Sequence, residues 1–128
     1  MSHGQYAAEA KERWGDTEAY KESQSRMAKY SEEEIKKAQL AMQTATNLML
    51  AAKRSGKPAD GAEAMAGAEA HRLSIHEWWY PCSHEMHTNL ALMYIADPRF
   101  TEHYESQEVG LAKYVHDAIV ANANAHAL

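Results

Sequence analysis

The sequence predicts an all-α fold, and two observations indicate it. Apolar residues recur at three- and four-residue steps in the segments that follow Ser31, as on one face of an α-helix, and residues that commonly cap helices precede these segments. No segment alternates apolar and polar residues with the period of two that is typical of a strand. The chain of 128 residues is long enough for one domain with an ordinary core, and four or five helices of uneven length are expected.

The N-terminal third, residues 1–30, is expected to fold only weakly. A short helix is predicted over residues 6–14, and Asp16 and Thr17 can cap a second one that carries Tyr20. Neither helix has a broad apolar face, and isolated helices this short are marginal in water. We therefore expect this part of the chain to become ordered when something covers it.

Residues 31–128 are expected to form the helical domain itself. Its strongest helix begins after Ser31, because Ser31 and Glu34 form a capping box and acidic residues occupy the first turn. Gly56 can end this helix in the left-handed conformation, and Pro58 prevents its continuation. The apolar face of the helix consists of Ile35, Ala38, Met42, Ala45, Met49 and Ala52.

Two further helices are predicted on either side of Pro81. Asp60 and Glu63 offer a second capping box, which would open an alanine-rich helix. Pro81 interrupts that helix, because proline lacks a backbone N–H and disfavours helical geometry in the residue before it. Ser83 can then cap the next helix.

The C-terminal part is predicted to contain a short helical turn and one longer helix. Asp97 is placed to cap the short turn. The last helix carries apolar residues at helical spacing from Leu111 to Ile119. The tail "NANAHAL", residues 122–128, is expected to fray.

Charge and composition exclude several classes of protein. The formal net charge is −5 and the lysines and arginines are scattered, so the chain alone is a poor candidate for binding nucleic acid. No apolar run approaches the roughly 20 residues of a membrane span, and the N-terminus lacks the apolar core of a secretory signal. The single cysteine cannot form an internal disulfide. We expect a cytoplasmic protein that does not contact membranes.

The most unusual stretch is "EWWYPCSHEMH", residues 77–87, and metal binding is one interpretation of it. Cys82, His84 and His87 are suitable ligand types, and His71 and His76 precede them. "HEMH" is nevertheless one residue short of the zinc motif H-E-x-x-H. There is no C-x-x-C pair, and the Glu-x-x-His pairs of di-iron bundles are absent. The spacing therefore predicts no native metal and no cofactor.

Nucleophilic chemistry at Cys82 is a second interpretation. Cys82 precedes a predicted helix and lies near His84 in the sequence, two features that favour a reactive thiolate. Catalysis would also need an orienting residue and an oxyanion hole, and a lone cysteine is more often a small buried hydrophobe. We therefore do not expect an enzyme, while capture of an electrophile by this thiol stays open.

A pocket wall is the third interpretation. Trp78, Trp79 and Tyr80 are consecutive, so they cannot all lie on one helix face, and Pro81 then turns the chain. At least one of these rings must leave the core. Aromatic rings at a bend suit a site for large apolar ligands. Two core rings and one surface ring are the alternative.

Three motifs resemble a known family. "ERWGDTEAY" (residues 12–20), "YPCSHEMHTNLALMYIADPRFTEHY" (80–104) and "GLAKYVHDAI" (110–119) occur in the order found in TipAS antibiotic-recognition domains, the effector-binding part of a group of MerR-type transcription activators. The resemblance implies a globin-like helical domain with a surface cleft and no haem. It also implies that residues 1–30 form a lid, which orders over the cleft when a bulky apolar ligand such as a thiopeptide antibiotic binds.

The resemblance also implies roles for individual residues. Trp78 and Trp79 are less typical of the family, and we expect them to reshape or partly fill the cleft. Some members capture dehydroamino-acid ligands through a cysteine thiol in this region, where this chain offers Cys82 or places Asn89 instead. The remaining implied ligand-binding residues are Trp14 and Tyr20 in the lid, Tyr80, Cys82, Glu85, Met86 and His87 along the cleft, and Tyr94 and Phe100 at its base or rim.

The sequence thus predicts the drug-sensing domain of a MerR-type activator. Its partners would be a small-molecule or peptide-antibiotic ligand, DNA only through a DNA-binding domain outside this chain, and a second copy in a full-length homodimer. The chain would be an excised domain or a short form that sequesters ligand. The rivals are a metal- or redox-sensing domain that uses Cys82 and nearby histidines, and a protein-interaction bundle without a small ligand.

Overall fold

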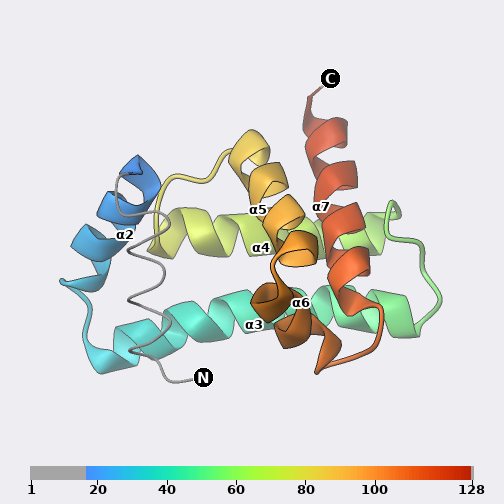
Figure 1. Cartoon of the computed structure of the whole chain (residues 1–128), viewed down its shortest axis with the longest axis horizontal. Coiled ribbons are helices and arrows are strands. Elements are labelled where there is room, and N and C mark those ends of the chain that lie inside the picture. The colour runs from blue at the N-terminus through green and yellow to red at the C-terminus, as the bar shows by residue number, and fades with distance from the viewer. Residues whose placement is uncertain (1–16, 128) are drawn as a thin grey trace.

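The computed structural model describes residues 17–127, and all of its regular elements are helices (Figure 1). The all-α prediction is therefore confirmed for this part of the chain. The helix predicted over residues 6–14 lies outside the described residues. The helices are α2 (Glu18–Met27), α3 (Glu32–Arg54), α4 (Ala62–Trp78), α5 (His84–Ala96), α6 (Pro98–Glu105) and α7 (Leu111–His126).

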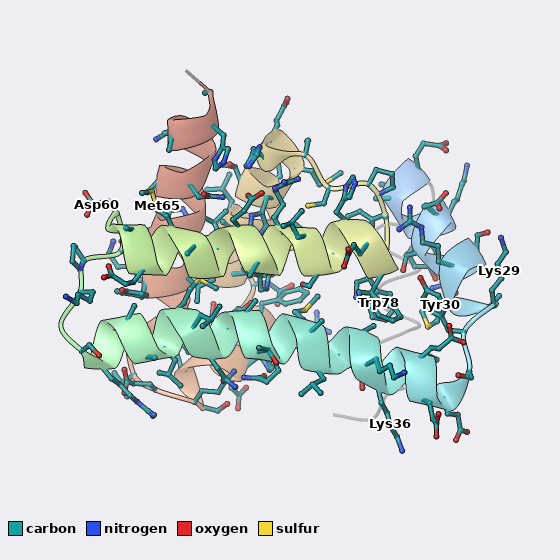
Figure 2. The ribbon with its side chains drawn as sticks, turned by 180° about the vertical axis from the view of Figure 1, so that it is seen from behind. Lys29, Tyr30, Lys36, Asp60, Met65 and Trp78 are labelled. Carbon is teal, nitrogen blue, oxygen red and sulfur yellow. The ribbon has the colours of Figure 1, made fainter. Side chains whose placement is uncertain are left out.

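The two long helices α3 and α4 form an antiparallel pair that supports the rest of the molecule. The shorter helices α5, α6 and α7 lie across one side of this pair, and α2 lies at the end where α3 begins and α4 ends (Figure 1). Figure 2 shows the pair from its other side. Gly67 allows the two helices to approach closely, because a Cβ atom there would lie 2.7 Å from Cγ of Met49.

The core lies between the α3–α4 pair and α7. Met49, Leu111, Val115 and Ile119 are its fully buried large aliphatic side chains. Small residues fill the remaining contacts and let the backbones approach: Ala38, Ala45, Ala52, Ala64, Ala68, Ala91, Ala112 and Ala118 are all buried. Among the described helices, none is long and apolar enough to cross a membrane.

Four of the predicted helix starts are confirmed by their capping hydrogen bonds. The Ser31 hydroxyl accepts from the Glu34 N–H at 3.2 Å, and the Glu34 carboxylate accepts from the Ser31 N–H at 3.0 Å, so the capping box is complete. The side chains of Thr17, Ser83 and Asp97 cap α2, α5 and α6 in turn. Gly56 has a φ of 75°, the left-handed conformation expected after α3.

The capping box predicted at Asp60 is wrong. The residue that precedes α4 is Gly61, and no side chain caps the helix. The Gly61 N–H donates to the Pro58 carbonyl at 3.0 Å, so Asp60 lies within a tight turn. The helix therefore begins one residue later than the capping pattern predicts. The turn around Pro58 therefore overrides the local capping pattern.

The expectation of a frayed C-terminus is also wrong, because α7 continues to His126. Two contacts with other helices hold its last turns. The Asn122 side chain donates to the Glu69 carboxylate of α4 at 2.9 Å, and the His126 ring stacks on the His84 ring of α5 at 4.3 Å between centroids. Tertiary contacts thus extend a helix whose end looks polar and featureless in the sequence.

Candidate functional site

The aromatic stretch lies at the bend between α4 and α5. The helix ends at Trp78, and the N–H groups of Trp79 and Tyr80 both donate to the Ile75 carbonyl, at 2.8 and 3.2 Å. Pro81 then turns the chain toward the first turn of α5. The rings of all three aromatic residues are half-buried, so none of them is fully enclosed in the core. This arrangement agrees with the expectation that consecutive rings cannot share one core face.

Helix α2 is attached to this bend mainly through polar contacts. Arg26 donates to the carbonyls of His76 at 2.9 Å and Glu77 at 3.3 Å, and the Tyr30 hydroxyl donates to the Trp78 carbonyl at 2.7 Å. These carbonyls belong to the last turn of α4, where they lack helical partners and attract positive charge. The Tyr30 and Trp78 rings also meet edge-on, 5.5 Å apart (Figure 2).

Helix α2 itself contributes nothing to the core. None of its residues is buried, and Tyr20 on this helix is half-buried. Its apolar attachment to the rest of the molecule is therefore small. Trp14, the other residue implied in the lid, lies outside the described residues.

Two buried polar atoms near the bend have no hydrogen-bond partner among the described residues. They are the indole Nε1 of Trp79 and the Nδ1 of His87. Buried polar groups are nearly always paired, so these two atoms are available to a further hydrogen-bond partner. Burial also raises the pKa of the Tyr80 hydroxyl well above its usual range, so this group stays protonated.

His87 lies on α5 in contact with His71 of α4. His71 Nδ1 and His87 Nε2 are 2.9 Å apart, and the Tyr104 hydroxyl lies 3.5 Å from the other nitrogen of His71. Burial lowers the pKa of His71 to about 4 and that of His87 to about 3. Both rings are therefore neutral near pH 7, and one donates its ring N–H to the other.

The rings of Tyr94 and Phe100 continue this cluster away from the bend. Tyr94 is buried, with its ring centroid 6.0 Å from His71, 5.6 Å from Phe100 and 5.2 Å from Tyr104. Phe100 is half-buried. The structure thus joins Tyr94, Phe100 and His87 into one aromatic group through His71.

Cys82 does not have the environment of a reactive thiolate. Its side chain is fully buried, and burial raises the pKa of the thiol to about 11. The hydrogen-bond partner of the His84 ring is the Glu69 carboxylate, 3.0 Å away. Arg72 donates to the Cys82 carbonyl at 2.7 Å, which fixes the backbone but leaves the thiol protonated. The sequence features that favoured a thiolate are therefore misleading.

The remaining predicted residues lie in the first turns of α5. Met86 is half-buried, and Glu85 and Asn89 are exposed. In the described part of the chain, no hydrogen bond or ion pair joins the Glu85 or Asn89 side chain to the aromatic group. Sequence reasoning missed Arg26 and Tyr30, whose partners lie about fifty residues away and leave no local signal.

The metal ligands suggested by spacing are not brought together. Cys82 is buried, and His87 pairs with His71 rather than with His84. Within residues 17–127, the side chains placed to share an ion are instead Glu69, His84 and His126, from three different helices.

Comparison with known proteins decides the family. Residues 6–122 match the model of the TipAS antibiotic-recognition domain. The chain belongs to this family. It is 43% identical over 122 residues to the HTH-type transcriptional activators TipA of Streptomyces coelicolor and Streptomyces lividans. That match covers 95% of this chain and 48% of each relative, so the chain spans about half of their length.

Two solved structures resemble this TipAS domain. One is TipAS from Streptomyces lividans in complex with nosiheptide, described as part of a thiopeptide antibiotic multidrug resistance system. It has a TM-score of 0.91 and 41% identity, with 100% of this chain and 90% of that chain covered. The other is the antibiotic-binding domain of a TipA-class multidrug resistance transcriptional regulator. It has a TM-score of 0.65 and 42% identity, with 71% of this chain and 97% of that chain covered.

Proposed function

We propose that this TipAS domain binds bulky, largely apolar thiopeptide-like antibiotics at the bend between α4 and α5. The observation that carries the proposal is the combination of three half-buried rings with two unpaired buried polar atoms, Trp79 Nε1 and His87 Nδ1. Apolar surface with a few free polar groups suits ligands that are rich in aromatic rings and amides. The similarity over the whole chain to a nosiheptide-bound relative supports it.

The proposed site extends beyond these two side chains. Trp78, Tyr80 and Met86 would supply apolar contact area, with Tyr94 and Phe100 behind them. Glu85 is exposed in the first turn of α5, so its role would be limited to the rim. Cys82 would support the bend through its backbone rather than bind ligand through its thiol, because that thiol is buried and protonated.

Residues 1–30 would act as the lid of this site. The support for this role is that α2 buries no residue and is held chiefly by the hydrogen bonds of Arg26 and Tyr30 to the end of α4. Such an element can leave without opening the core. Trp14 and Tyr20 would then contact the ligand, as the family resemblance implies.

The domain would act as a sensor and not as a catalyst. Ligand binding here would control a transcription activator of the MerR type, in which DNA contacts and dimerisation belong to another part of the protein. The support is the similarity to TipA activators over half of their length. The rival that uses Cys82 and nearby histidines as a metal or redox sensor receives no support from the position of Cys82.

Calorimetric titration with nosiheptide tests the proposed function. A ligand present at 100 times its dissociation constant should stabilise the domain by roughly 2.7 kcal/mol, and the melting temperature should rise accordingly. Replacing Trp79 by alanine should weaken binding by about 1–3 kcal/mol, as for a buried aromatic anchor. Replacing it by phenylalanine should weaken binding less than alanine does, because an aromatic ring remains while the N–H and part of the ring area are lost.

Leu40→Ala is the matched control, since Leu40 is exposed on α3 with 65% of its surface accessible. Its affinity should equal that of the unaltered chain. The absence of any heat or thermal shift with nosiheptide and related thiopeptides would refute the proposal. Equal losses in the Trp79 and Leu40 variants would place the site elsewhere.

A further inference from the structure

Helices α4, α5 and α7 meet at a group of three side chains that the antibiotic site does not use. Glu69 comes from the middle of α4, His84 is the first residue of α5, and His126 is the last residue of α7. One ligand atom of each lies within 4.8 Å of the others. His84 Nε2 and Glu69 Oε1 are already 3.0 Å apart.

We propose that Glu69, His84 and His126 form a binding site for a divalent transition metal ion of the zinc class. Two imidazole nitrogens and one carboxylate oxygen are the donor set of open zinc sites, in which water completes the coordination. Calcium and magnesium would be disfavoured, because they prefer oxygen ligands. Glu69 and His84 are half-buried and His126 is exposed, so an ion can reach the group from solvent. This inference does not depend on antibiotic binding.

The protonation of His126 favours this role. Its Nδ1 lies 2.8 Å from the Asn122 carbonyl oxygen, and a carbonyl can only accept, so Nδ1 carries the proton. In the neutral ring, Nε2 then carries a lone pair that can bind a metal ion. Metal-binding histidines usually hold their second nitrogen in this way, against a backbone carbonyl.

The carboxylate of Glu69 is held in place by its own neighbours. Arg72 contacts both of its oxygens, at 2.6 and 3.0 Å, and the Asn122 side chain donates to Oε1 at 2.9 Å. Hydrogen bonds, first of all those from Arg72, lower the pKa of Glu69 to about 2, so it is an anion under all ordinary conditions. The positive charge of Arg72 opposes that of the ion, and affinity should be lower than at a closed structural zinc site.

Binding requires one local rearrangement. The His84 and His126 rings are stacked at an interplanar angle of 15°, and parallel rings cannot both direct a lone pair at one ion. His126 is exposed in the last turn of α7, so its ring can turn toward the ion without disturbing the core. His84 Nε2 donates to the Glu69 carboxylate, so its proton must leave or move to Nδ1 before Nε2 can bind the ion. The two atoms then need little displacement, because zinc at about 2.05 Å from both in tetrahedral geometry would separate them by about 3.3 Å.

Titration of the full chain with Zn²⁺ and Co²⁺ after chelator treatment tests this site. His3 lies outside the described residues, and it is replaced by alanine in all samples so that it cannot bind the ion. We expect one ion per chain, and a cobalt absorption spectrum typical of four- or five-fold coordination. His84→Ala and His126→Ala should each weaken binding by at least about tenfold.

His103→Gln is the matched control, since His103 is exposed and lies outside the group, and its affinity should not change. His126→Ala changes only an exposed residue at a helix end, so this variant should fold normally. Unchanged affinity in His126→Ala, equal losses in all histidine variants, or no bound ion would overturn the proposal.

Discussion

His71 and His87 form a buried pair that cannot accept a proton without penalty. Their pKa values fall from the ordinary value of 6.5 to about 4 and about 3 because burial disfavours the charged ring. The unfolded chain therefore binds more protons than the folded domain once the pH falls below about 6.5, and stability is lost with falling pH. The charged and titratable groups that act on the pair are Glu69, Arg72, His84 and His103.

We predict that the histidine pair leaves the free energy of unfolding unchanged between about pH 7 and pH 8, and that this free energy falls below about pH 7, by up to about 1.4 kcal/mol per pH unit for each proton taken up. A His71→Gln/His87→Gln variant should lose most of this dependence between about pH 6.5 and pH 5, because it keeps hydrogen-bonding capacity without titrating. Urea denaturation at several pH values is the measurement. An equally steep pH dependence in the double variant would show that other groups are responsible.

Cys82 should react slowly despite its position before a helix. Because its side chain is fully buried, alkylation by a small maleimide should require opening of the structure. We predict that labelling of the folded chain, followed by mass spectrometry, is much slower than labelling in denaturant. A nosiheptide complex should likewise dissociate on denaturation without leaving a covalent adduct on Cys82. Rapid stoichiometric labelling of the folded chain would contradict this account.

The attachment of α2 to the end of α4 should control the mobility of the proposed lid. Replacing Arg26 by alanine and Tyr30 by phenylalanine removes the hydrogen bonds to the carbonyls of His76, Glu77 and Trp78. We predict faster amide exchange throughout α2, with little change in the melting temperature, because α2 buries no residue. Ligand affinity should fall in proportion to the loss of the attached state.

Lys21→Ala is the control for this prediction, since Lys21 is exposed and makes only a 3.8 Å ion pair with Glu18. Amide exchange in α2 should be the same as in the unaltered chain. A large drop in melting temperature for the Arg26 and Tyr30 variant would mean that α2 is part of the stable fold and does not serve as a lid.

Helix boundaries could be predicted where the capping residue and its partner are close in sequence. Ser31, Ser83 and Asp97 each bond a backbone N–H two or three residues away, so pattern and structure agree. The prediction of a cap at Asp60 was wrong because a proline turn competes for the same residues. The prediction of a frayed end for α7 was wrong because its stabilising contacts come from Glu69 and His84. Capping patterns do not describe such tertiary contacts.

The candidate site could be predicted only in part for the same reason. The aromatic bend is visible in the sequence because three rings are consecutive and a proline follows. The pairing of His71 with His87, the attachment of Arg26 and the group of Glu69, His84 and His126 join residues from different helices. The spacing of residues along the sequence does not predict these contacts between helices. The environment of Cys82 depends on such contacts, so it could not be predicted either.

The molecule as a whole should recognise a ligand without recognising DNA. Its formal net charge is −5, and the matched TipA activators are about twice as long as the region that they share with this chain. We predict no sequence-dependent binding to the operator DNA of such an activator in gel-shift assays. Tight binding that distinguishes the operator from unrelated DNA would contradict the assignment of this domain to ligand recognition alone.

The most direct test of the proposed antibiotic site is a ¹H–¹⁵N correlation spectrum recorded during titration with nosiheptide. The indole N–H of Trp79 gives a separate signal, and it should shift strongly as it gains a partner, together with the amides of the α4–α5 bend and of α2. A second surface serves as the internal control: a shallow groove of about 380 Å³ lined by Leu48, Ala51 and Ala66, among others. Shifts confined to that groove, with the Trp79 indole signal unchanged at saturation, would contradict the account.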